Sequence, residues 1–148
     1  MDSKKEVLNH LLVVMFNQIL NIEEAALKKG KFNNLTLSEL HVITAIGCEM
    51  ALPMTVIASK LDVTVGTLTI AMNNLVKKGY VTRVRSEEDR RVVLIALTEI
   101  GVEAYAHHEA FHEEMINFTM SSLSSTETDV LVKTLSKVTD YFNRKYHE

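Results

Sequence analysis

The distribution of apolar residues along the chain predicts long helices at both ends. Between residues 7 and 20, apolar side chains recur every three or four positions, which is the spacing of a broad face of an α-helix. Gly30, with two lysines before it, suits the end of this helix, which we expect to be heavily buried. The same spacing recurs over 104–118 and 131–142. The chain therefore begins with one long amphipathic helix and finishes with two.

The middle of the chain predicts shorter helices with definite starts. Thr36 and Glu39 have the spacing of a capping box, and Ser124 with Glu127 repeats it before the last helix. The only proline, Pro53, suits the first turn of a short helix that ends near residue 61. Soon after it, residue 64 is a threonine that can cap the next helix. Two short helices with a tight connection predict a helix-turn-helix.

After Gly79 the pattern changes to that of strands. Residues 80–85 and 92–97 are rich in β-branched side chains and flank a polar turn, which predicts a β-hairpin, or wing. Thr98 can then cap the following helix. We therefore predict an all-α fold with a small β-hairpin wing (α+β class), a winged helix-turn-helix.

We expect the 148 residues to form a single domain. Its core covers about 34–98, and terminal helices cover about 2–30 and 99–146. Because little chain remains to cover the apolar faces of these helices, we expect them to pack against a second copy in a two-fold homodimer.

The composition is that of an ordinary globular protein, with 47% hydrophobic and 24% charged residues. No apolar run is long enough to cross a bilayer, and the first residues do not resemble a signal peptide. We expect a cytoplasmic protein that does not bind membranes. The only cysteine, Cys48, excludes an intrachain disulfide; we predict a small buried core residue, with a redox-sensing thiol as the alternative.

The charge is distributed unevenly. The net charge is −3, but residues 77–91 carry six basic and three acidic side chains. A basic segment on an acidic chain is typical of a protein that binds a polyanion, although an ordinary solvated surface has the same composition. The segment follows a helix-turn-helix and contains a hairpin, so it predicts binding to double-stranded DNA.

The helix after Thr64 has one apolar side and one side that is free to enter a groove. The free side carries Gly66, Thr67, Ile70, Asn74 and Lys77. Threonines at the helix start can contact phosphates, Gly66 allows close approach, and Asn74 suits an adenine edge. In the wing, Asp89 lies two residues before Arg91, so its carboxylate can hold one arginine in place while the other reaches a minor groove. The predicted DNA-binding residues are Thr64, Gly66, Thr67, Asn74, Lys77, Lys78, Arg83, Arg85, Asp89, Arg90 and Arg91, with Lys77, Lys78, Arg83 and Arg85 on phosphates.

The stretch from Asp89 to Thr98, DRRVVLIALT, with Gly101 after it, resembles the wing signature of the MarR family. The segment LVKKGY over 75–80 resembles the end of the family's recognition helix. The resemblance implies a homodimer, usually a repressor, that binds a pseudo-palindromic operator with one recognition helix per half-site.

Within that family, residues 64–69, 73–75 and 83–91 are most similar to the FabT-type repressors of fatty-acid biosynthesis. This similarity implies that long-chain acyl groups on acyl carrier protein act as corepressor, between the dimerisation helices and the DNA-binding core, and that no cofactor is required. The predicted effector pocket contains Met15, Ile19, His41, Ile43, His108 and Phe111, residues that would equally serve as ordinary core.

A zinc-responsive repressor is the alternative. His108 and His112 are one helical turn apart, and the zinc-sensing branch of the family implies Glu24 and His41 as the remaining Zn²⁺ ligands. We do not expect an enzyme, because the sequence has no phosphate loop, nucleophile motif or H-E-x-x-H. A helical interaction protein that does not bind DNA is the alternative of another class, but it would not need a basic wing.

Overall fold

The computed structural model describes residues 3–147, which fall into two compact units. Unit 1 ends at Glu109 and unit 2 begins at Ala110, so the division lies within one helix. Asp2, where the first of the two predicted terminal segments starts, lies outside the described residues.

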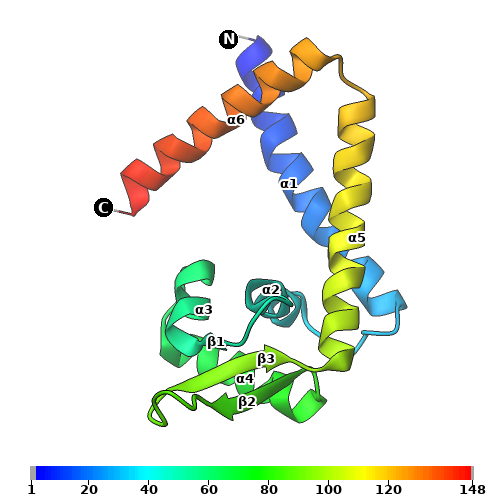
Figure 1. The fold of residues 1–148 in the computed structure, drawn as a ribbon. Helices are drawn as coiled ribbons and strands as arrows, with labels where there is room; N and C mark the ends of the chain where they lie inside the picture. Colours follow the sequence, from blue (N-terminus) through cyan, green and yellow to red (C-terminus); the bar gives the residue numbers. More distant parts are fainter. Residues whose placement is uncertain (1–2, 148) are drawn as a thin grey trace. The chain divides into compact units, whose positions relative to one another are not determined.

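The predicted fold class is confirmed: six helices accompany a small antiparallel sheet in the described residues (Figure 1). The wing strands and helix ends lie within one or two residues of their predicted positions, whereas strand β1 was not predicted. Unit 1 contains α1 (Ser3–Lys29), α2 (Leu37–Ile46), β1 (Leu52–Pro53), α3 (Met54–Leu61), α4 (Val65–Lys78), β2 (Val81–Arg85), β3 (Val93–Leu97) and the first part of α5 (Glu99–Ser121). Unit 2 contains the rest of α5 and α6 (Ser125–Tyr146).

The helix starts follow the predicted capping residues. The Thr36 hydroxyl accepts a hydrogen bond from the Glu39 N–H at 3.1 Å, and the Glu39 carboxylate accepts one from the Thr36 N–H at 3.2 Å. Ser124 and Glu127 make the same reciprocal pair at the start of α6. Pro53 departs slightly from the prediction, because it is the residue before α3 rather than a member of its first turn. Local sequence thus determines where these helices begin.

The sheet has the strand order β1-β3-β2, with both pairs antiparallel. In the β2–β3 hairpin Arg83 lies opposite Ile95, and β1 places Leu52 on the other side of Ile95. Ile95 is completely buried. The central strand therefore attaches the wing to the apolar core.

The core of unit 1 is formed where α2, α3 and α4 pack on the sheet. Gly101 lets α5 approach it closely, because a Cβ there would lie 2.2 Å from the carbonyl oxygen of Tyr80. A side chain at position 101 could therefore be accommodated only if the backbone moved. The large side chains that are fully buried are Ile43, Ile57, Leu68, Met72, Leu75, Tyr80 and Ile95.

The prediction that the first helix is heavily buried was wrong for the single chain. Of the described residues of α1, only Glu23 and Leu27 are buried. Apolar periodicity shows that a face needs cover but not which molecule supplies it. Among the described residues no single helix is long and apolar enough to cross a membrane; α3 and α4 reach that length only together, with a bend of 107° between them.

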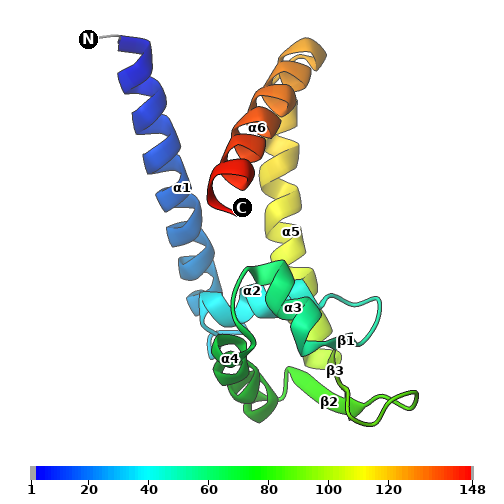
Figure 2. The same cartoon turned by 90° about the vertical axis from the view of Figure 1, so that its left-hand side faces the viewer.

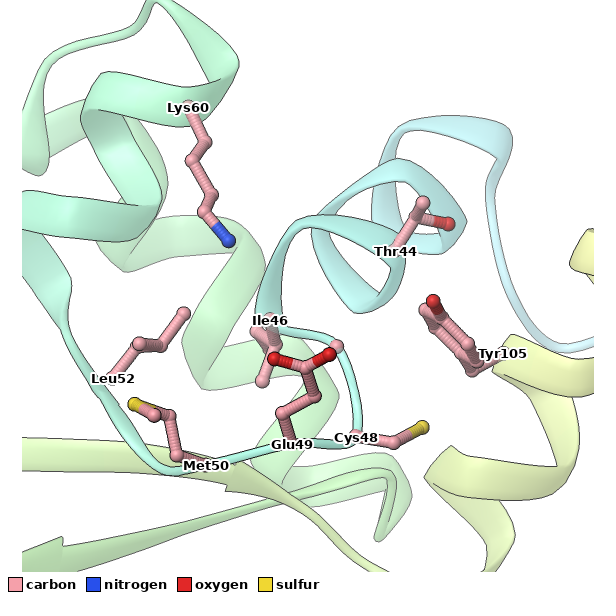
Figure 3. A pocket seen from close by; sticks show the side chains of 9 residues that line it. Thr44, Ile46, Cys48, Glu49, Met50, Leu52, Lys60 and Tyr105 are labelled. Atoms are coloured by element: carbon pink, nitrogen blue, oxygen red, sulfur yellow. The ribbon is translucent and has the colours of Figure 1, made fainter.

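The prediction that Cys48 is buried was also wrong. Cys48 is exposed on the loop after α2, where it lines a pocket of about 330 Å³. Figure 3 shows Cys48 and Glu49 on this loop, with Lys60 reaching toward the end of α2 from α3. The Lys60 ammonium donates to the carbonyl oxygen of Ala45 at 3.3 Å. None of the predicted site residues lines this pocket.

Candidate nucleic-acid interface

The connection between α3 and α4 has the geometry of a helix-turn-helix. Asp62 takes the left-handed conformation, with φ 54° and ψ 47°, and the Val63 N–H donates to the Ala58 carbonyl oxygen at 3.0 Å. The helices on either side are bent by 107°, within the range typical of DNA-binding helix-turn-helix pairs. The second helix of such a pair is the one that enters the major groove.

The beginning of α4 is open to solvent. The Thr64 hydroxyl accepts a hydrogen bond from the Thr67 N–H at 3.1 Å and donates to the Thr67 hydroxyl at 3.0 Å. A Cβ on Gly66 would meet only the Thr64 hydroxyl, at 3.9 Å, so the backbone can be approached closely here. A helix N-terminus with exposed hydroxyls suits a phosphate group.

The two sides of α4 differ as the apolar pattern predicts. Leu68 and Leu75 are buried against the core, whereas Ile70, Asn74 and Lys77 are exposed. Both views of the molecule show α4 and the β2–β3 hairpin at the same end of unit 1 (Figures 1 and 2). The exposed side of the helix and the basic hairpin can therefore face one ligand.

Asn73, which was not predicted, connects α4 to the wing. Its side-chain oxygen accepts a hydrogen bond from the Arg83 guanidinium on β2. Asn73 lies at the edge of the exposed side of α4, where a helical wheel alone does not separate a DNA contact from an intramolecular one. Arg83 is thereby oriented by the recognition helix, and its guanidinium remains exposed.

The wing tip is ordered by Asp89, as predicted. Its carboxylate accepts hydrogen bonds from Arg91 Nε at 3.0 Å, from Arg91 Nη2 at 3.1 Å and from the Arg91 N–H at 3.1 Å. These bonds lower the pKa of Asp89 below its ordinary value. Arg85 donates to the carbonyl oxygen of Arg90 at 2.8 Å. Arg91 is thus the arginine that is held, and the exposed Arg90 is the other one.

Lys78 does not have the environment predicted for a phosphate contact. Its ammonium donates to both carboxylate oxygens of Glu39, at 2.8 and 2.9 Å, and to the Asn34 carbonyl oxygen at 2.6 Å. Glu39 is buried, and Lys78 is partly buried. The ion pair connects the end of α4 to the start of α2. Lys78 is therefore an anchor of the recognition helix, and Lys77 is the exposed lysine at this position.

Two of the predicted histidines lie together in unit 1. The rings of His41 and His108 have their centroids 5.9 Å apart, and His41 Nε2 lies 3.8 Å from a carboxylate oxygen of Glu23. A ligand atom of Glu23 and one of His108 lie within 4.8 Å of each other, and both residues are buried. His112 follows one turn later on α5.

The carboxylate beside these histidines is that of Glu23 and not the predicted Glu24. Glu24 is exposed and pairs with Lys28 at 3.3 Å. The spacing to Leu27 could have indicated this, because Glu23 lies four residues before that buried leucine and so shares its helix face.

The apolar residues predicted for an effector pocket have different environments. Ile43 is completely buried in the core of unit 1, Met15 is 45% exposed on α1, and Ile19 is partly buried. Phe111 belongs to unit 2, where its ring contacts that of His112. The acyl pocket remains a prediction.

Comparison with known proteins supports the interpretation of α3, α4 and the wing. The model of the MarR family matches residues 35–93. HTH-type transcriptional regulator SarZ of Staphylococcus haemolyticus is 33% identical over 128 residues, which cover 86% of this chain and 84% of the relative. This chain belongs to the MarR family.

A solved structure shows the same fold over most of the chain. The crystal structure of Streptococcus pneumoniae FabT in complex with DNA has a TM-score of 0.89 and 35% sequence identity, covering 95% of this chain and 98% of that one. The multiple antibiotic resistance protein MarR of Escherichia coli is 27% identical over 106 residues, 71% of this chain and 74% of its own length. As a MarR-family member, the chain is a DNA-binding transcriptional regulator with a winged helix-turn-helix.

Proposed function

We propose that this MarR-family protein is a homodimeric repressor of fatty-acid biosynthesis genes, with acyl-acyl carrier protein as corepressor. The observation that carries the proposal is the similarity to FabT in complex with DNA, which extends over 95% of the chain. The segments 64–69, 73–75 and 83–91, which resemble FabT-type repressors, are the start of α4, the residues beside the wing and the wing itself. The similarity therefore includes the parts that contact DNA under this proposal.

The apolar surface of α6 supports a dimer. None of its residues is buried in the single chain, yet it presents Leu131, Leu135, Val138 and Phe142 at helical spacing. Most of the stability of a helix in a protein comes from tertiary packing of its apolar face, and the single chain does not bury that face of α6. A second copy is the partner we propose, because repressors that read a pseudo-palindrome are themselves two-fold symmetric.

Selection of genomic DNA tests the target genes. Purified protein is incubated with sheared DNA of its own source, and the retained fragments are sequenced. Promoters of fatty-acid biosynthesis genes should be enriched, with a repeated inverted sequence. Enrichment of unrelated promoters would contradict the fatty-acid role alone, whereas no enrichment over random DNA would contradict site-specific binding.

The corepressor is tested with the selected operator. Fluorescence polarisation is measured with carrier protein bearing a C16 or C18 acyl chain, and with the same carrier protein without one. The acylated form should raise operator affinity at least ten-fold, and the unacylated form should not. Equal effects of the two forms would contradict recognition of the acyl chain.

A zinc-responsive repressor is the second candidate, and the cluster of Glu23, His41 and His108 favours it. Two imidazoles and a carboxylate are ligands that Zn²⁺ prefers. Carboxylates and imidazoles also form ordinary buried hydrogen bonds, so the cluster alone supports less than the similarity to FabT does.

A matched pair of variants distinguishes the two uses of this cluster. Zn²⁺ binding is measured by calorimetry for the wild type, Glu23→Gln and Glu24→Gln. If the site binds zinc, Glu23→Gln should weaken binding at least ten-fold while Glu24→Gln, on the neighbouring exposed position, has no effect. Equal affinities in all three proteins would exclude the cluster as a zinc site.

A further inference from the structure

Ile70 occupies an unusual position on the recognition helix. It lies halfway along the outer side of α4, almost opposite the buried Leu68, Met72 and Leu75. Its side chain is 69% exposed, and no large apolar side chain among the described residues of unit 1 is more exposed. Single exposed apolar residues are common on protein surfaces. This one, however, lies at the centre of the surface that faces DNA in the proposed function.

The neighbours of Ile70 on the helix do not cover it. The positions three and four residues away hold Gly66, Thr67, Asn73 and Asn74, all of which are exposed and none of which is a large apolar residue. Gly66 in particular leaves open space on the side toward the helix N-terminus. The side chain therefore projects alone between groups that can form hydrogen bonds.

Such an arrangement has a chemical counterpart in the major groove. Thymine is distinguished there by its C5-methyl group, which proteins recognise by apolar contact. Adenine instead presents a hydrogen-bond donor and an acceptor in the same groove. A β-branched side chain is already restricted about χ1 in a helix, so little freedom is lost when it makes such a contact. Asn74, one turn further along, is placed to reach an adenine edge.

We propose that Ile70 determines sequence specificity by contacting the C5-methyl group of a thymine in each half-site. The inference rests on the proposed binding of operator DNA through α4. It adds an apolar reader to a surface from which the sequence predicted only hydrogen-bonding and charged contacts. The recognised step then includes a thymine close to the base whose edge Asn74 reads.

Replacement of thymine by uracil tests this directly, because it removes the methyl group and leaves the base pair intact. An operator is selected from a random duplex library with the purified protein, and its thymines are replaced in symmetric pairs by deoxyuridine. At one pair of positions the affinity of the wild type should fall about four-fold per methyl group, or about fifteen-fold for two half-sites.

Two variants assign the effect to Ile70. Ile70→Ala should bind the thymine and uracil operators equally, and alanine favours the helix, so α4 should be retained. Val102→Ala, which shortens an exposed β-branched residue on α5, should keep the full preference for thymine. Circular dichroism confirms folding of both.

The outcomes are separable. Failure of the wild type to select any operator would contradict the proposed function. Selection of an operator with no thymine preference at any position, or a preference that persists in Ile70→Ala, would overturn the role of Ile70 alone. The absence of any thymine preference in the wild type would overturn the proposal even without the variant.

Discussion

The helices of the winged-helix part of unit 1 and helix α6 of unit 2 have the same apolar periodicity but differ in whether the chain buries their apolar sides. In unit 1, Ile43, Ile57 and Ile95 are completely buried within the chain itself. In α6, Leu135 and Phe142 lie seven positions apart on one side of the helix, and they are 45% and 50% exposed. A well-formed capping box begins both α2 and α6, so local helix signals do not separate them.

The difference teaches that one region is complete as a single chain and the other is not. Polar groups in unit 1 are also paired internally, since Lys78 is bonded to Glu39, and the Tyr80 hydroxyl donates to Asn34 at 2.7 Å. The DNA-reading end is therefore held rigidly by its own fold. The terminal helix needs a partner, which we propose to be a second copy.

The largest effect is expected in the core of unit 1. Ile57→Ala should lower the free energy of unfolding by about 2–5 kcal/mol, because it leaves a cavity among α2, α3 and α4. Urea denaturation at fixed protein concentration measures this. Val56→Ala, next to it but 38% exposed, is the matched control and should cost much less. If both variants lost the same free energy of unfolding, the burial of Ile57 would not contribute to stability as expected.

A charge on the apolar side of α6 tests the other half of the comparison. Leu135→Asp should convert the dimer to a monomer and reduce operator affinity at least ten-fold, because an unpaired charge would be buried between copies. Analytical ultracentrifugation reports the mass. Lys133→Asp places the same residue on the opposite side of the helix and should remain dimeric. A dimeric Leu135→Asp protein would show that α6 is not in the interface.

The two adjacent lysines at the end of α4 should behave differently. Lys77→Ala should reduce the slope of log affinity against log salt by about one, because an exposed lysine releases a counterion from DNA. Lys78→Ala should leave the slope unchanged and instead lower stability, because the buried Glu39 loses its ion pair. Polarisation at several salt concentrations and urea denaturation measure the two quantities. A reduced slope in Lys78→Ala would show that this lysine does contact phosphate.

The smallest effect concerns the pH dependence of the wing tip. The hydrogen bonds from Arg91 lower the pKa of Asp89, so its contribution to wing order is present above the ordinary value of 3.8 and is lost as the pH falls through the lowered pKa. Carbon-detected NMR of the Asp89 carboxyl should show titration below 3.8. Arg91→Ala should return the pKa toward that value, and Arg90→Ala should not. Identical titrations in both variants would contradict the pairing.

Much of the reading surface could be predicted because it depends on residues close in sequence. Thr64 caps α4 through a bond to Thr67, and Asp89 holds Arg91 two residues later. Such contacts are encoded by spacing alone. The exposed position of Ile70 likewise follows from helical periodicity.

The remaining features depend on residues that are distant in sequence. The ammonium of Lys78 is bound by a carboxylate 39 positions earlier, and strand β1 forms only because β3 is present beside it. The choice of Glu23 over Glu24 depends on which side of α1 meets His41.

The sequence by itself therefore determined the order of elements, the helix starts, the helix-turn-helix and the wing, since each is specified by interactions within one or two turns of chain. The tertiary structure decided which charged groups are free to meet DNA and which are held internally, because that depends on long-range partners. It also showed that the apolar sides of the terminal helices remain exposed in the single chain. Periodicity records that such a side must be buried, but only the packed structure shows how much of it the chain itself can cover.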